Sequence, residues 1–167
     1  MKKAILASII AIILLSACTQ KQVLHRKDFS EPVFELFSLS SYYKDGYYYI
    51  CNGFGENASE YLIFSKEREL IKKVNLDFEL LAPSKVATAD ALRPFLGRNT
   101  DELEKVFGDC HFDLASGLYK PSYITSDAHL IVFVTFSGEI SDVAKIDLLT
   151  GHWEEYSLYK TADGSRS

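Results

Sequence analysis

The side chains with the clearest capacity for chemistry are three cysteines and four histidines. Cys51 and Cys110 can form a disulfide in an oxidising compartment, although their spacing does not separate that bond from two free thiols. A catalytic thiol needs a histidine partner, and His111 directly follows Cys110. Neighbouring side chains on a strand point to opposite faces, so we do not expect this pair to act as nucleophile and base.

The other candidates do not form a recognisable active site. His111, His129 and His152 lack the spacing of a zinc site. Asp113, Ser116 and His129 could be assembled into a hydrolase triad, but the chain has no G-x-S-x-G nucleophile elbow. It also has no P-loop and no dinucleotide-binding fingerprint. We therefore expect a protein without catalytic activity, metal ion or other cofactor.

The third cysteine, Cys18, has a more specific context. Lys2 and Lys3 precede an uncharged apolar run, Ala4–Leu15, of 12 residues. This run is too short to cross a bilayer, which needs about 20 residues. The sequence Leu15-Ser16-Ala17-Cys18 resembles the lipobox of bacterial lipoproteins. The resemblance implies removal of residues 1–17 and a diacylglycerol on Cys18, with or without a third chain such as palmitate. Two or three acyl chains anchor a protein stably where one does not. A plain secretory signal with an incidental cysteine is the alternative.

The chain expected after this cleavage has 150 residues, which suits one domain. It carries 16 basic and 23 acidic residues, a net charge of −7. Such an acidic chain argues against a nucleic-acid partner. We expect a location in the cell envelope, on the non-cytoplasmic side of a membrane. Because Thr19 rather than aspartate follows Cys18, an outer membrane is allowed.

Residues 18–31 are expected to form the lipidated cysteine and a flexible tether. Polar residues and the charges of Lys21, Arg26 and Lys27 follow one another there without periodicity. A coil of about 12 residues would reach roughly 20 Å. The charges can contact anionic lipid headgroups at about 1 kcal/mol each, or belong to an ordinary solvated linker.

Residues 32–160 are expected to form a single domain, beginning with an antiparallel β meander over 32–82. Asp45-Gly46 lies between two tyrosine-rich runs and predicts a tight hairpin. A tyrosine offers a flat apolar face with a polar tip, so Tyr43, Tyr47 and Tyr49 are candidates for binding a glycan or another small ligand. Consecutive strand residues face opposite ways, and packing in the core or at an edge is the alternative.

Residues 83–149 are predicted to place two short helices on an antiparallel sheet. The first helix runs from about Ala87 to Leu92, and the second is capped by Thr100 and stopped by Gly108. Strands are predicted over Phe112–Ser116, Lys120–Ile124, Leu130–Phe136 and Ile140–Leu148. The third of these strands is apolar on both faces and needs cover on both. Unless the meander supplies that cover, Ile131 and Phe133 are candidates for binding a protein partner.

Several motifs in this part resemble the SmpA/OmlA (BamE-like) lipoprotein domain, whose two-helix, three-strand unit also occurs in the β-lactamase inhibitor protein. They are Gly97-Arg98-Asn99-Thr100, Leu103, Phe107-Gly108, Tyr119, Tyr123 and Phe136–Val143. The similarity covers about Pro83–Leu149, and it departs from the family at Cys110, where proline is usual. The resemblance implies an α+β fold of this unit and a non-catalytic module that binds another protein.

Trp153, the only tryptophan, lies in a segment over 150–160 that is expected to close one end of the core or to act as a binding hot spot. Residues 161–167 are expected to be disordered. The sequence as a whole predicts a membrane-anchored envelope lipoprotein, which acts as an interaction or scaffold module for an envelope protein. The alternative is an envelope protein that binds a glycan or small ligand through its tyrosine-rich hairpin.

Overall fold

The computed structural model describes residues 22–53, 56–85, 88–114 and 119–158. The predicted signal peptide, the lipidation site Cys18, the triad candidate Ser116 and the predicted tail lie outside these residues. Within them, no helix combines the length and the apolarity needed to cross a membrane.

The amino-terminal half forms a five-stranded antiparallel sheet in the order β2-β3-β4-β6-β7. Its strands are β2 (Phe34–Leu36), β3 (Leu39–Lys44), β4 (Tyr47–Asn52), β6 (Tyr61–Phe64) and β7 (Leu70–Val74). The hairpin predicted at Asp45-Gly46 is present between β3 and β4. Both turn residues have positive φ, at 52° and 90°, as a two-residue turn between twisted strands requires.

The predicted flexible tether is wrong from Leu24 onward. Strand β1 (Leu24–His25) pairs with β5 (Asn57–Ala58), and the 3₁₀-helix η1 (Arg26–Asp28) follows. The Arg26 guanidinium donates hydrogen bonds to the carbonyls of Phe29 and Ser30 and lies 4.9 Å from the Tyr42 ring centroid. This basic segment is therefore ordered by backbone pairing with β5 and by the Arg26 guanidinium, which bonds two carbonyls of the segment and lies over the Tyr42 ring of β3.

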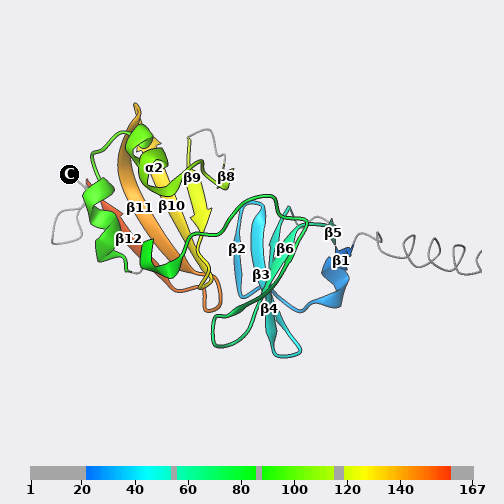
Figure 1. Ribbon diagram of the computed structural model, residues 1–167. Helices are drawn as coiled ribbons and strands as arrows, with labels where there is room; N and C mark the ends of the chain where they lie inside the picture. Colours follow the sequence, from blue (N-terminus) through cyan, green and yellow to red (C-terminus); the bar gives the residue numbers. More distant parts are fainter. Residues whose placement is uncertain (1–21, 54–55, 86–87, 115–118, 159–167) are drawn as a thin grey trace, which may run out of the picture.

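The carboxy-terminal half forms a second five-stranded antiparallel sheet, in the order β12-β11-β10-β9-β8. Its strands are β8 (Phe112–Asp113), β9 (Pro121–Ile124), β10 (His129–Phe136), β11 (Glu139–Asp147) and β12 (Trp153–Ser157). The predicted closing segment is thus the fifth strand of this sheet. Figure 1 shows the two sheets side by side, with α2 (Thr100–Phe107) over the carboxy-terminal one.

The predicted α+β fold class is wrong, because the molecule is mostly β. In the described part of the chain α2 is the only α-helix, and its N-cap is Asn99 rather than Thr100. The first predicted helix is replaced by the 3₁₀-helices η2 (Pro83–Lys85) and η3 (Asp90–Phe95). Pro94 lies inside η3, where a regular α-helix would lose a hydrogen bond and meet a steric clash. The two-helix unit implied by the BamE-like resemblance is therefore not formed.

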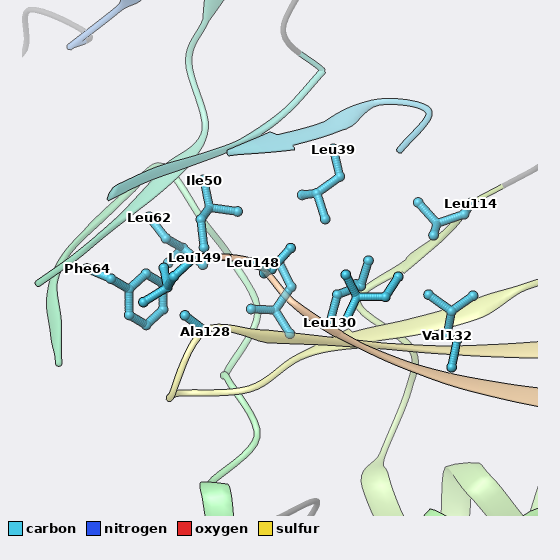
Figure 2. Packing of buried hydrophobic residues seen from close by; sticks show 13 residues of the cluster. Leu39, Ile50, Leu62, Phe64, Leu114, Ala128, Leu130, Val132, Leu148 and Leu149 are labelled. Atoms are coloured by element: carbon cyan, nitrogen blue, oxygen red, sulfur yellow. The ribbon is translucent and has the colours of Figure 1, made fainter. Parts of the chain in front are cut away.

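The two sheets share one apolar core (Figure 2). Leu39, Ile50, Leu62 and Phe64 of the amino-terminal sheet meet residues of the other sheet and its turns: Leu114, Ile124, Ala128, Leu130, Val132, Ala144, Ile146, Leu148 and Leu149. The buried Ser41 hydroxyl donates a 2.6 Å hydrogen bond across this core to the Leu148 carbonyl. The halves are thus joined by both apolar packing and a satisfied buried polar group.

The opposite face of the carboxy-terminal sheet packs under α2 and η3. Leu92, Leu103 and Phe107 cover Ile131 and Phe133, both of which are 0 % exposed. Strand β10 is apolar on both faces, and both are covered within the protein. The short helices cover the face of Ile131 and Phe133, and the amino-terminal sheet covers the face of Leu130 and Val132.

Candidate functional site

An apolar pocket of about 80 Å³ lies between the β2–β3 turn and the carboxy-terminal sheet. We call it the Phe37–Trp153 pocket. Its apolar lining consists of Leu36 and Phe37 beside β2, Leu114 after β8, Val132 and Val134 of β10, Ala144 of β11 and Trp153 of β12. Lys120, Asp142 and Glu155 complete the lining.

Strand register explains why these residues meet. Val132 pairs with Ala144 and Val134 with Asp142. Ala144 pairs in turn with Glu155, so these side chains project from one face of the sheet. This is the face that, further along the strands, packs against the amino-terminal sheet. The pocket is the part of that face which the first sheet leaves uncovered.

Phe37 has an unusual conformation for its residue type. It follows Leu36 in the tight connection between β2 and β3, where its φ is 52°. The left-handed region costs an L-residue about 1–2 kcal/mol, and it is an outlier for a bulky side chain. Phe37 is nevertheless 55 % exposed. Burial of the ring in the protein's own core therefore does not account for a phenylalanine at this turn.

The pocket combines aromatic walls with a charged rim. Trp153 is 48 % exposed, and the Lys120 ammonium lies 5.2 Å from the Phe37 ring centroid. The Asp142 carboxylate accepts a 2.7 Å hydrogen bond from the Ser141 hydroxyl. Two carboxylates against one ammonium give the rim an acidic balance. Residues 75–158 as a whole are also acidic, with six basic and 14 acidic residues.

The three candidate tyrosines do not form one binding surface. Tyr43 lies on the sheet face of Tyr48, with ring centroids 4.9 Å apart. Tyr49 lies on the other face, where its ring meets Phe29 at 5.2 Å. Tyr47 shares that second face by strand alternation and is 42 % exposed. The exposed rings of Tyr43 and Tyr47 therefore point away from each other.

The apolar and cysteine candidates from the sequence do not form a site together either. Ile131 and Phe133 are buried beneath the helices, so their proposed role in contacting a partner is wrong. Of the two alternatives that their spacing left open, the structure has Cys51 and Cys110 as free thiols rather than a disulfide. Cys51 is buried beside Tyr61, and this burial raises the pKa of its thiol to about 12. Cys110 Sγ lies 3.7 Å from the Tyr119 hydroxyl.

Polar groups gather in a second pocket, of about 140 Å³, at the end of β10 and β11. It is lined by His129, Lys145, Asp147, His152 and Glu154. None of these residues has a hydroxyl or thiol nucleophile. Among the described residues, no group of three or more His, Cys, Asp or Glu side chains is arranged to hold a metal ion. Within the described part of the chain, this cluster therefore offers neither a hydroxyl or thiol nucleophile nor a group of three side chains arranged to hold a metal ion.

A third cavity, of about 350 Å³, lies beside β1 and η1. Its lining residues are His25, Arg26, Lys27, Glu56 and Asn57. The Arg26 side chain is engaged in the contacts described above, whereas Lys27 and His25 are exposed. The cavity thus presents cationic groups at the amino-terminal end of the folded chain.

Sequence reasoning found Trp153 but missed Phe37 and Lys120. The available signal was a bulky aromatic residue directly before Ser38, between two runs that form strands. Turn positions usually hold glycine, asparagine or aspartate, so a phenylalanine there is a departure that a sequence can reveal. Comparison with protein-family models, with curated proteins and with solved structures gives no match for this chain.

Proposed function

We propose that this chain is a lipid-anchored envelope protein that binds another protein through the Phe37–Trp153 pocket. The observation that carries the proposal is Phe37, a strained and exposed aromatic residue at the mouth of an apolar pocket. Strain of this kind persists where the surrounding structure enforces it, and it is common at binding sites. Aromatic side chains in a partly closed pocket are also typical of interaction hot spots.

The size and charge of the pocket define its occupant. A volume of about 80 Å³ has room for roughly five water-sized groups, which matches one apolar side chain rather than a sugar or an acyl chain. The acidic balance of the rim favours cationic residues beside that side chain. The occupant is therefore a segment of a partner protein with one apolar side chain next to lysine or arginine.

The membrane anchor in this proposal rests on Leu15-Ser16-Ala17-Cys18 and the apolar run before it. Acylation of Cys18 would confine the pocket to the membrane surface and raise its effective concentration toward partners in the same membrane. The glycan alternative has less support, because the exposed tyrosines lie on opposite faces of their sheet.

In-cell photo-crosslinking tests the proposal. Benzoylphenylalanine replaces Phe37 in one strain and, in a matched control, Tyr47, an exposed aromatic residue on β4 of the same sheet that does not line the pocket. We expect a defined envelope protein to be captured from position 37 and not from position 47. The same strains with Cys18→Ala are expected to lose acyl labelling and the captured partner. Equal capture from both positions, or capture from position 47 alone, would contradict the assigned pocket. Acyl labelling that is unchanged by Cys18→Ala would contradict the anchor.

A further inference from the structure

The chain leaves very little length between the proposed anchor and the folded domain. Strand β1 begins at Leu24, six residues after Cys18. Six residues span at most about 20 Å even when fully extended. If Cys18 is acylated, the β1 end of the domain must stay within that distance of the lipid headgroups.

This end of the molecule carries the cationic cavity. Figure 1 places β1 and β5 at the far end of the amino-terminal sheet from α2. The cavity beside them presents His25, Arg26 and Lys27 against the carboxylate of Glu56, and Asn57 adds an amide. Backbone pairing fixes this surface, since Leu24 pairs with Ala58 and the Arg26 N–H donates to the Glu56 carbonyl at 3.2 Å.

Charge differs between the two ends of the chain. Residues 22–74 hold seven basic and eight acidic residues, a net charge of −1. Residues 75–158 hold six basic and 14 acidic residues, a net charge of −8. A negatively charged bilayer surface therefore repels the carboxy-terminal half more strongly than the amino-terminal half.

We infer that the cavity lined by His25, Arg26, Lys27, Glu56 and Asn57 is a contact site for the phosphate of anionic lipid headgroups, and that this contact fixes the orientation of the domain on the membrane. The inference rests on the proposed acylation of Cys18. Lys27 supplies the free ammonium group, Asn57 can donate through its amide, and Arg26 adds charge while its hydrogen bonds hold η1 in place. The Phe37–Trp153 pocket, built largely from the other sheet, then stays clear of the lipid.

The test uses the mature lipidated protein in vesicles of phosphatidylglycerol and phosphatidylcholine in equal parts. A donor fluorophore is attached at Ser30→Cys, beside η1, or at Val106→Cys, on the exposed face of α2, with Cys110→Ser in both. The acceptor is attached to lipid headgroups. We expect higher energy transfer from position 30 than from position 106, and a smaller difference with Lys27→Glu, because the short link to Cys18 still keeps position 30 near the membrane. The matched variant Lys85→Glu, which makes the same charge change in η2, is expected to retain the full difference. A difference that Lys27→Glu leaves unchanged would overturn the inference.

Two further arms separate the possible failures. Vesicle flotation before the measurement tests whether the protein is anchored. Protein that does not float would contradict both the proposed anchor and this inference. Protein that floats but shows equal transfer from both positions overturns the inference alone. Vesicles of phosphatidylcholine are expected to reduce the difference. If inorganic phosphate in solution, at a concentration matching the lipid phosphate, instead lowers the difference to its Lys27→Glu value, the site belongs to free phosphate and the membrane assignment is overturned.

Discussion

Arg68, in the turn between β6 and β7, donates a hydrogen bond to the carboxylate of Asp147 on β11 and so ties one sheet to the other. The same guanidinium donates to the Asp127 carbonyl at 3.2 Å. Asp147 also accepts the Leu149 N–H at 2.9 Å. Burial opposes ionisation of Asp147, but these hydrogen bonds and the Arg68 charge hold the pKa of its carboxyl below the usual range.

Arg68→Ala is expected to lower the free energy of unfolding at neutral pH by about 2 kcal/mol, because two hydrogen bonds from a charged group are lost. Urea denaturation measures the change, and Arg68→Lys should give an intermediate value. The depressed pKa means that this contribution is present at neutral pH and disappears as pH falls through the folded-state pKa of Asp147. A difference between the wild type and Arg68→Ala that persists unchanged into strong acid would argue against this ion pair as its cause.

His111 should make the protein less stable in mild acid. Burial lowers the pKa of its imidazole from 6.5 to about 4, and Nδ1 accepts the Ile124 N–H at 2.9 Å. The unfolded chain therefore takes up a proton near pH 6.5, whereas the folded chain resists until pH approaches 4. Stability is expected to fall as pH decreases between these values.

His111→Asn provides the comparison, because an amide oxygen can accept the same hydrogen bond without titrating. Thermal melts of both proteins at several pH values between 4 and 7 measure the effect. The variant should show a shallower fall than the wild type. Identical pH profiles would assign the acid sensitivity to other groups.

Ile131→Ala is expected to cost about 2–5 kcal/mol of unfolding free energy, since the residue is fully buried under α2 and η3. Ile71→Ala, at a residue that is 54 % exposed on β7, should change stability by less than about 0.5 kcal/mol. Chemical denaturation of the two variants checks this contrast. A small effect at Ile131 would restore it as a candidate surface residue.

Local sequence signals located much of the fold but not its assembly. The Asp45-Gly46 turn, strand β10 and helix α2 follow from turn chemistry, apolar runs and capping residues, all of which act over a few positions. Strand β12 was missed because Trp153–Ser157 has no apolar alternation, and its conformation is set by pairing with β11. Strand β1, in the segment predicted to be a flexible tether, was missed for the same reason. Leu24 is ordered by pairing with Ala58, which lies 34 positions away in the chain.

The candidate pocket also depends on contacts between residues far apart in the sequence, which local patterns do not predict. Trp153 was noticed because it is the only tryptophan, but its place in one pocket with Phe37 depends on how the two sheets pack. The apolar character of Ile131 correctly indicated a strand that needs cover on both faces. Sequence alone could not decide whether that cover was a partner or the protein's own helices.

Phe37→Asn separates binding from folding. Asparagine tolerates positive φ better than phenylalanine, so the variant is expected to keep its unfolding free energy or gain up to about 1 kcal/mol. Loss of the exposed ring should nevertheless abolish capture of the partner from a crosslinker placed at Trp153. Tyr47→Asn, which removes a similarly exposed ring from the other side of the sheet, should leave that capture unchanged. A Phe37→Asn protein that is destabilised by several kcal/mol would show that the ring serves the fold, because lost packing would then outweigh the relief of strain. A stable variant that still captures the partner would move the binding site away from this pocket.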